Sequence, residues 1–402
     1  MRRSAYHTLW PAMVLLFAGT AHAEIEASVD LRLVDSNGPT SFIDGGWGKL
    51  RFDADDDGLN LGRARFAWRG SPGGNWHLNL DLSAWSLDDH HIIDMTEAWA
   101  EWRPVPQNAW RSNVKIGAFF PPISLEHRAP GWSNPYTISS SAMNTWVGEE
   151  LRTIGIGYEL EHLGQASGSA FDFGVNAAVF GWNDPAGIIL ALRGFAMHDR
   201  QTPVFGRIGS YAYGGPDQRV EFAEIDGRAG IQAGAFVKHD SGVELRALHY
   251  DNQADPSAYM PSIDDYAWNT KFDTAGIRYD GSRGTTLIAQ WLGGTTAAGP
   301  GFANKWEYEA AFVLVAQTLG DHRIAARYDD FSTYQLASQY PGPLSVEDGH
   351  AITFGWTWAV HEHVELAAEW LEIKSDFTSR VVLGQPTKAV EHSLQLALRL
   401  IL

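Results

Sequence analysis

The residues of this sequence with the clearest chemical potential are arginines that recur at even spacing. Arg63 and Arg65 lie two positions apart, and Arg323 and Arg327 lie four apart. In an extended strand such residues project from one face, where their guanidinium groups can hold carboxylate or phosphate oxygens. Together with Lys115 they would form a basic surface that binds anionic groups weakly enough to release them.

Carboxylates share the predicted face of these cations. Glu97 and Glu101, four positions apart, project from one side of a single predicted strand. The acidic residues expected on this face are Asp81, Glu97, Glu101, Glu159, Asp172, Glu244, Glu307, Glu309, Asp329, Glu365 and Glu369. Because the two signs nearly balance, the face should be hydrophilic without a strong net charge.

A third group of charged and aromatic residues belongs to an unusually long connection, residues 121–150. The residues of interest are Glu126, Arg128, Trp132, Glu149 and Glu150 within this connection and Arg152 just after it. A connection of about thirty residues is long for an ordinary loop. We expect it to fold inward and set a field opposite the arginines; the alternatives are that it covers the channel mouth or contacts another subunit.

The elements that must position these residues are strands, because apolar and polar residues alternate with a period of two through most of the chain. The first such segment is Ile25 to Leu33. The last, Ser393 to Leu402, has a leucine at every second position. One face of each segment is apolar and the other polar, which suits a wall between lipid and water.

Turn signals divide the chain into sixteen segments of this kind. Seven tight turns are predicted at residues 71–75, 104–109, 162–169, 238–242, 280–284, 317–321 and 359–363. Eight longer segments alternate with them at residues 35–58, 86–93, 121–150, 181–226, 251–269, 293–304, 332–350 and 375–386. We therefore predict an all-β, transmembrane antiparallel barrel of about sixteen strands, with short periplasmic turns, long extracellular loops and the third loop in the lumen.

Aromatic residues support this fold independently, because several flank the predicted tight turns on the apolar face. They are Trp68, Trp76, Trp102, Trp110, Tyr158, Tyr279 and Trp358. Such a girdle is typical of the interface between membrane and water. The alternative is a soluble β-sandwich or propeller, but the sequence shows no repeat of the length of a propeller blade.

Residues 1–23 have the features of a secretory signal peptide. Arg2 and Arg3 precede a short apolar run, and Ala21-His22-Ala23 forms a small-residue cleavage site. The mature barrel domain should therefore comprise residues 24–402. The formal net charge of the whole chain is −18, which makes nucleic acid an unexpected partner, and without cysteine the chain has no disulfide or thiolate-ligated metal.

Two other chemistries can be weighed from the residues. The acidic run from Asp53 to Gly58 offers oxygen ligands to a divalent cation, but it lacks the closing glutamate of a calcium-binding loop; we assign no metal and no cofactor. Ser139, Ser140 or Ser141 could act with His127 in a hydrolase, yet no nucleophile-elbow pattern surrounds these serines. We therefore expect no enzymatic activity.

Three stretches resemble the phosphate-selective porin O and P family of outer-membrane porins. Residues 61–66 (LGRARF) are similar to the family's basic strand, and residues 92–102 with 114–126 resemble the paired strands that lead into its third loop. Residues 152–158 also fit. The resemblance is clearest over residues 59–160 and only topological beyond them.

The resemblance implies a sixteen-stranded, trimeric porin with a basic path for anions, on which Arg63 and Arg65 are the matching positions. Two features depart from the family's pattern. The chain is strongly acidic, and the third loop has no dense lysine cluster.

These observations lead to an expected function: a passive, water-filled channel in the bacterial outer membrane for small hydrophilic solutes, including anionic, phosphate-like ones. Its expected partners are outer-membrane lipid, lipopolysaccharide and two further copies in a homotrimer. Lumen aromatics, among them Trp99, Phe119, Trp132 and Trp146, would stack on sugars or brace the third loop. The alternatives are a general or carbohydrate-type porin with weak or cation selectivity, and a structural or adhesive barrel.

Overall fold

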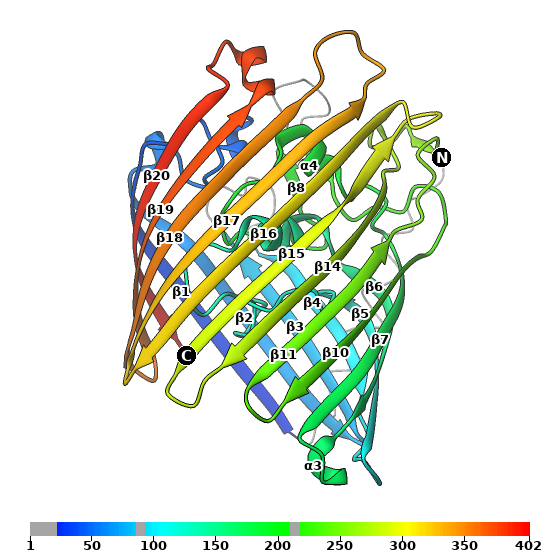
Figure 1. The fold of residues 1–402 in the computed structure, drawn as a ribbon, viewed down its shortest axis with the longest axis vertical. Coiled ribbons are helices and arrows are strands. Elements are labelled where there is room, and N and C mark those ends of the chain that lie inside the picture. The colour runs from blue at the N-terminus through cyan, green and yellow to red at the C-terminus, as the bar shows by residue number, and fades with distance from the viewer. Residues whose placement is uncertain (1–21, 86–92, 210–217) are drawn as a thin grey trace.

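The computed structural model describes residues 22–85, 93–209 and 218–402. Within them, sixteen strands form one closed barrel, and each strand is antiparallel to both neighbours (Figure 1). In barrel order the strands are β1 (His22–Ser36), β2 (Gly58–Gly73), β3 (Trp76–Ala84), β4 (Asp94–Trp102), β5 (Trp110–Phe119), β6 (Thr153–His162), β7 (Phe171–Gly181), β10 (Gly230–His239), β11 (Val243–Asp251), β14 (Asn269–Asp280), β15 (Thr285–Ala298), β16 (Asn304–Leu319), β17 (His322–Ala337), β18 (Val346–His361), β19 (Val364–Phe377) and β20 (Lys388–Ile401). The predicted fold class is confirmed.

The barrel closes where its first strand meets its last. Val29 of β1 lies opposite Ala64 of β2 on one side and opposite Leu400 of β20 on the other. At the end of this seam the backbone N–H of Leu402 donates to the carbonyl of Ala27 at 2.7 Å, and the Ala27 N–H donates back at 3.2 Å. The wall therefore has no unpaired strand edge.

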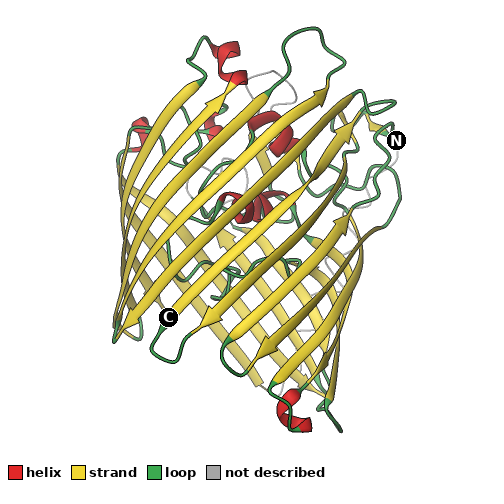
Figure 2. Ribbon diagram, viewed as in Figure 1, coloured by secondary structure: helices red, strands yellow, loops and turns green. Residues whose placement is uncertain are grey.

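All seven predicted tight turns join neighbouring strands at one end of the barrel, and the long connections lie at the other (Figures 1 and 2). The turn between β2 and β3 has Gly73, Gly74 and Asn75 at φ values of +99°, +61° and +71°. Glycine and asparagine tolerate this left-handed region best. The turn between β6 and β7 contains the short helix α3 (Gly164–Ser167).

The long connections carry the remaining elements. We call residues 37–57 loop one, residues 120–152 loop three and residues 182–229 loop four. The helices and short strands of the long connections are η3 (Phe42–Asp44), η4 (Ala54–Asp56), α2 (Ala142–Glu150), α4 (Ile188–Arg193), β8 (Arg207–Gly209), β9 (Gln218–Val220), β12 (Tyr259–Met260), β13 (Asp265–Tyr266) and η5 (Thr378–Leu383). Helix α2 lies in the middle of the barrel (Figure 2).

Two predicted loops are wrong in extent. The connections expected at residues 293–304 and 332–350 shrink to residues 299–303 and 338–345, because β15 to β18 continue past their apolar portions. Polar cross-strand pairs hold these extensions; for example, the Tyr334 hydroxyl donates to Asp348 at 2.5 Å. The sequence prediction ended each strand where its apolar residues ended. The backbone hydrogen bonds between neighbouring strands do not require apolar side chains, so the strands continue farther.

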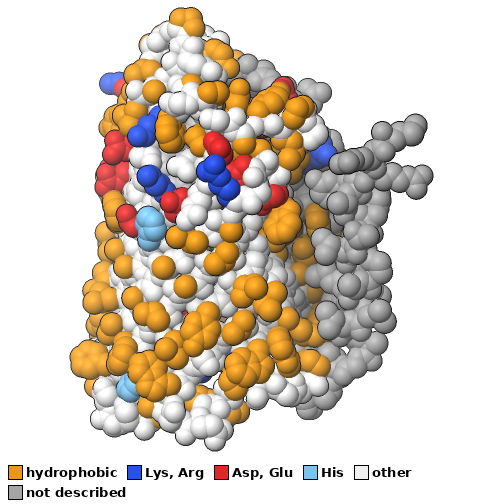
Figure 3. Space-filling view, turned by 90° about the vertical axis from the view of Figure 1, so that its right-hand side faces the viewer, with side chains coloured by type: hydrophobic (Ala, Val, Ile, Leu, Met, Phe, Trp, Pro, Cys, Tyr) orange, Lys and Arg blue, Asp and Glu red, His pale blue; other side chains and the backbone are white. Residues whose placement is uncertain are grey.

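The exterior carries the apolar face that the alternation predicts. Leu394, Leu396, Leu398 and Leu400 of β20 are all exposed, as are Trp76, Trp102, Trp110, Tyr158 and Tyr279 near the short turns. Figure 3 shows apolar side chains spread over the lower part of one face, with charged side chains gathered above them. This is the outward pattern of a barrel whose lower belt lies in lipid.

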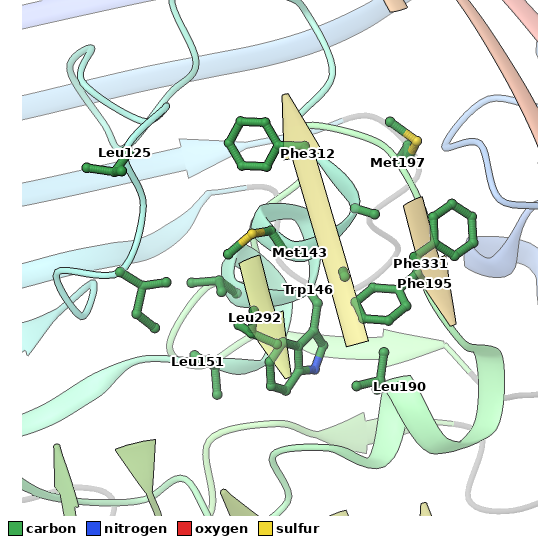
Figure 4. Packing of buried hydrophobic residues seen from close by; sticks show 14 of the residues in the cluster. Leu125, Met143, Trp146, Leu151, Leu190, Phe195, Met197, Leu292, Phe312 and Phe331 are labelled. Atoms are coloured by element: carbon green, nitrogen blue, oxygen red, sulfur yellow. The ribbon is translucent and has the colours of Figure 1, made fainter. Parts of the chain in front are cut away.

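The interior is less polar than predicted, because several strands also direct apolar side chains inward. Phe272 of β14, Leu292 of β15 and Phe312 of β16 are buried and belong to the same cluster as Trp146 of α2 (Figure 4). The cluster joins the wall to the loops inside it. Instead of a fully water-lined bore, the barrel has an apolar core on this side.

This interior core explains one wrong prediction. Glu307 and Glu309, expected in the lumen, lie on the exposed face of β16, where the Glu309 carboxylate accepts a hydrogen bond of 2.6 Å from the Trp291 indole. The buried face of β16 instead carries Tyr308 and Phe312, among others. Apolar residues occupy both faces of this strand, so alternation alone could not identify the inner one.

Some predictions fall outside the described residues. They are the body of the signal peptide, residues 1–21, and most of the second long loop, residues 86–92 with Asp88 and Asp89. No helix in the described ranges is long and apolar enough to cross a membrane.

Candidate functional site in the barrel lumen

Loop three crosses the lumen, as predicted, and is held by side chains of the wall. Near its start, the amide side chain of Gln290 on β15 accepts from the Leu125 N–H at 3.0 Å. Farther along, Arg327 on β17 donates to the Ser139 carbonyl at 2.8 Å, and Glu369 on β19 accepts from the Ser139 N–H at 2.9 Å. The loop is thus fastened to well-separated strands.

Glu126 organises this loop from within. Its carboxylate accepts from the N–H and the hydroxyl of Ser141, each at 2.8 Å, and from the Asn144 amide at 3.1 Å. Ser141 is the N-cap of α2, so Glu126 positions the start of the helix. Burial raises the pKa of Glu126, although the nearby Arg327 opposes this shift. This predicted constriction residue is fully buried and faces no open space.

The two carboxylates at the end of α2 bind loop four. Arg193 donates to both oxygens of Glu149, at 2.8 and 2.6 Å, and His198 lies 3.0 Å from the same carboxylate. Burial disfavours the ionised carboxylate, but Arg193 and His198 outweigh it and hold the pKa of Glu149 well below its usual range. Glu149 is therefore an ionised partner for a buried arginine.

Glu150 has a different environment, although it is the next residue. Its carboxylate accepts from the Trp146 indole and, at 2.7 Å, from the Ile189 N–H of α4. Burial raises its pKa to about 7, the two hydrogen bonds oppose this, and the neighbouring Glu149 adds to it. Glu150 thus joins α2 to α4 and is positioned to change its charge near neutral pH.

Loop four and loop one complete a plug that the sequence prediction missed. Lys49 of loop one forms a fully buried ion pair with Glu347 of β18 and donates to the Arg193 carbonyl at 2.7 Å. Burial lowers the pKa of Lys49 to about 8, although the Glu347 carboxylate opposes this. Asp199 of loop four pairs with Arg32 of β1 at 2.5 Å. Loops one, three and four are therefore tied to each other and to the wall.

One sequence signal could have indicated the plug. Ile188 to Leu192 is an uninterrupted apolar run within an otherwise polar loop, and Phe42, Trp47 and Phe52 lie in the acidic first loop. Apolar residues in loops need a cover, and here Ile188, Phe42, Trp47 and Phe52 are all buried.

A lumen cavity with polar walls has a volume of about 250 Å³. Among its lining residues are Arg32, Arg63, Arg65, Arg323 and Arg399, with Glu26, Asp30, Asp199 and Glu365. The structure thus gathers three of the four wall arginines singled out by their spacing. Arg327 lies apart, buried against loop three and paired with Asp329 at 2.8 Å.

The arginines of this cavity differ in how far their charge is neutralised. Arg65 is held by Asp81, at 2.5 Å, and by Glu26. Arg63 donates instead to the Ser83 hydroxyl and the Gly131 carbonyl, and its distance to Asp81 is 3.8 Å. Arg323 donates to the Pro135 carbonyl at 2.6 Å. Arg63 and Arg323 are thus paired less closely with carboxylates than Arg65 is.

The other predicted lumen residues do not line this cavity. Lys115 is 3.7 Å from Glu101 and lies over the ring of Trp99. Glu97 accepts from the Phe120 N–H at 3.2 Å, so it holds the start of loop three. Arg128 donates to Glu244 of β11 at 2.9 Å. These residues share the lumen but form no single cluster.

Trp132 and Arg152 have structural contacts in this conformation. The indole of Trp132 stacks between Phe120, with ring centroids 4.1 Å apart, and His127, with centroids 3.9 Å apart. The Arg152 guanidinium lies 3.5 Å from the centre of the Phe120 ring. Because both faces of Trp132 are occupied, the indole braces loop three and leaves no face on which a sugar could stack.

In the structure His127 lies within hydrogen-bonding distance of Ser140, as a serine hydrolase would require. His127 Nε2 lies 2.9 Å from the Ser140 hydroxyl, but its Nδ1 is hydrogen-bonded to the Ser124 hydroxyl, at 2.9 Å, where a triad has a carboxylate. Burial and the charges of Arg327 and Arg63 hold the pKa of His127 well below its usual range. The arrangement is that of a hydrogen-bonded loop brace.

The acidic first loop does gather oxygen atoms. Carboxylate oxygens of Asp44, Asp53 and Asp56 lie within 4.8 Å of one another. Asp53 also caps the short helix η4 and accepts from the Ser41 N–H at 2.7 Å. This cluster braces the loop, and no metal is assigned to it.

Comparison with known proteins supports the fold. No family model matches the sequence, and no curated protein matches it. Among solved structures, the chain is similar to an anion-selective porin from Comamonas acidovorans, with a TM-score of 0.52, 12% identity, and 95% and 99% of the two chains covered. It is also similar to the trimer form of OmpT from Vibrio cholerae (0.52, 10%, 95% and 99%) and to Salmonella typhi OmpF in complex with daunomycin (0.51, 11%, 94% and 97%).

At these identities the likeness concerns the fold alone, and the fold is the sixteen-stranded porin barrel. The similar structures are porins and outer-membrane proteins in general, so the resemblance to the phosphate-selective family is supported only to that level.

Proposed function

We propose that this chain is an outer-membrane porin, a passive channel for small hydrophilic solutes. The supporting observation is a closed porin barrel whose exterior is apolar near the short turns and whose lumen holds a cavity of about 250 Å³ lined by arginines. A barrel of this size is wide enough for an aqueous path. The mature protein begins at Glu24, after export through the bacterial inner membrane, and no bond is made or broken in transport.

Anionic solutes are favoured, because the two least neutralised arginines border the same cavity. Arg63 and Arg323 donate their hydrogen bonds to hydroxyls and loop carbonyls, and the Asp81 carboxylate lies 3.8 Å from Arg63, beyond hydrogen-bonding distance. A carboxylate or phosphate group could exchange with those contacts at low cost. Phosphate-like anions are one such class, and they are the solutes that the family resemblance implies.

The channel works as a homotrimer surrounded by outer-membrane lipid and lipopolysaccharide. The similar OmpT structure from Vibrio cholerae is a trimer form, and the exposed apolar wall of this chain suits both lipid and neighbouring barrels.

Single-channel recording in planar bilayers tests the proposal, with reversal potential measured in a potassium chloride gradient. Stepwise conductance with anion selectivity is the expected result. Stepwise conductance with weak or cation selectivity would support the general or carbohydrate-type porin instead. Folded protein that never conducts would contradict the channel proposal.

One observation favours a second candidate, a barrel in which the loops matter more than the pore. Loops one, three and four share buried ion pairs such as those of Lys49 with Glu347 and Glu149 with Arg193. A plug held this firmly suits a structural or adhesive barrel. Recordings that stay closed after the plug has been loosened by substitution would support this candidate.

A further inference from the structure

A second lumen cavity lies on the opposite side of loop three from the arginines. Its volume is about 100 Å³. Phe119, the last residue of β5, lines it together with Phe120 and Pro122 at the start of loop three, and the rest of its wall comes from β4, β5, β6, β7 and β10. The polar residues that line it are Glu101, Asn113, Lys115, Glu159, Asn176 and Gln232.

Small residues in the wall make room for this cavity. Gly157 lies between Lys115 and Ala178 in the strand register, and Gln232 follows on the next strand. In the adjacent row, Gly234 lies opposite Asn176. Larger side chains at these positions would fill the space between the polar groups, so the wall is hollowed where they converge.

The amides of this wall lack partners. Neither the nitrogen nor the oxygen of the Asn176 amide has a hydrogen bond within the described residues, and the same holds for the side-chain oxygen of Gln232. Asn176 is 8% exposed and Gln232 3%. Buried polar groups are rarely left unpaired, because each one costs free energy. A polar molecule in the cavity would satisfy these groups once the two amides turn toward it.

The charges beside these amides have both signs. Lys115 is only loosely engaged by Glu101, at 3.7 Å, Glu101 also accepts from the Asn113 amide at 3.4 Å, and a second carboxylate, Glu159, lines the same cavity. The cavity therefore offers one ammonium group, two carboxylates and amide groups that can donate and accept. A molecule with an ammonium and a carboxylate of its own matches this set.

We propose that this cavity binds small free α-amino acids. The amino acid's ammonium group faces Glu159 and the Gln232 oxygen, and its carboxylate faces Lys115 and the Asn176 N–H. The proposal deepens the proposed channel function and rests on it only for the route by which the solute enters. It also assigns different solutes to the two sides of loop three, anions to the arginine side and zwitterions to this side.

Binding is tested by titration calorimetry on the full-length folded protein in detergent, with L-alanine as the probe. Lactate lacks the ammonium group, isopropylamine lacks the carboxylate, and glycerol is an uncharged polyol. Saturable binding of L-alanine is expected, with each of the other three weaker by about tenfold or more. Equal binding of glycerol, or no saturable binding of L-alanine, would overturn the proposal.

Variants locate the site. Glu159→Gln and Lys115→Met should each weaken L-alanine binding by about tenfold, whereas Lys374→Met, on the outer face of β19, should leave it unchanged. Heat-modifiable mobility on gels verifies that each barrel is folded. Wild-type affinity in both Glu159→Gln and Lys115→Met would place the binding elsewhere and contradict the proposal.

The two proposals fail separately. Binding of L-alanine by protein that never conducts would retain the site and reject the channel. Stepwise conductance without L-alanine binding would retain the channel and reject the site.

Discussion

The guanidinium of Arg193 and the carboxylate of Glu149 form two parallel hydrogen bonds, 2.8 and 2.6 Å long, between side chains with no exposed surface. This pair joins loop four to the last turn of α2, and its members are 44 residues apart in the sequence. A barrel lumen is normally wet, so a dry ion pair in it shows how closely the loops pack.

Arg193→Met should loosen the plug. The substitution leaves the Glu149 carboxylate buried without its main partner, a change that costs about 3 to 5 kcal/mol in buried pairs. We expect loop four to separate from α2 and single-channel conductance to rise. Arg228→Met, which removes an exposed loop arginine, is the matched control. Identical conductance of the Arg193 variant and the control would contradict the assigned role.

Packing of α2 against α4 should weaken as pH rises through neutrality. The folded pKa of Glu150, about 7, is raised above its ordinary value of 4.5, so the folded state binds the extra proton. The stabilisation is fully present below about pH 4.5 and is lost as pH passes 7. It is on the order of 3 kcal/mol. Hydrogen exchange of α2 amides between pH 5 and 8 measures this loss.

Glu150→Gln provides the comparison for that measurement. Glutamine cannot ionise, and its single amide oxygen can replace only one of the two carboxylate oxygens that accept from the Trp146 indole and the Ile189 N–H. The corrected exchange rates of α2 should then be independent of pH. If the variant kept the wild-type pH profile, another group would be responsible.

Anion selectivity should depend on Arg63 and Arg323, the two cavity arginines that donate no hydrogen bond to a carboxylate. Arg63→Gln and Arg323→Gln should each move the reversal potential toward that of a cation-selective channel, and the double variant should move it farther. The cause is loss of positive charge beside the 250 Å³ cavity. Lys374→Gln removes a positive charge from the outer wall, and its reversal potential should match that of the wild type.

Trp132→Ala should destabilise loop three without reducing sugar permeation. The indole is stacked between Phe120 and His127, so its removal forfeits packing worth about 3 kcal/mol but no sugar contact. Liposome swelling with glucose should be as fast as for wild type or faster, with faster proteolysis of loop three. Slower glucose uptake by a folded variant would show that the indole does contact the solute.

The strands of the barrel wall could be predicted from sequence because the alternation that defines each strand lies within that strand. Each strand must present lipid with apolar side chains, so Leu394 to Leu400 identify their own face. The method failed where both faces of a strand are apolar. On β16, Tyr308 and Phe312 pack on the plug while Glu309 lies outside, and nothing local to that strand distinguishes them.

The plug could not be predicted from local patterns, because its partners come from distant parts of the chain. Nothing in the sequence around Lys49 indicates that it pairs with Glu347. The same holds for the ion pair between Arg32 and Asp199. The sequence predicts that Glu126, Glu149 and Glu150 face open water in an inward loop. Glu126 is instead covered by loop three itself and by Arg327, and Glu149 and Glu150 are covered by loop four.

The pairing of β1 with β20 means that the barrel can close only when its last strand is present. Because the first strand pairs with the last, a chain that stops before β20 leaves β1 and β19 with strand edges whose backbone groups no water can satisfy within lipid. Glu391 of β20 also accepts from the backbone N–H of Lys49 in loop one, at 2.8 Å. The final strand therefore closes the wall by pairing with β1 and also holds loop one inside the barrel. Loss of β20 would affect both the wall and the packing of the loops in the lumen.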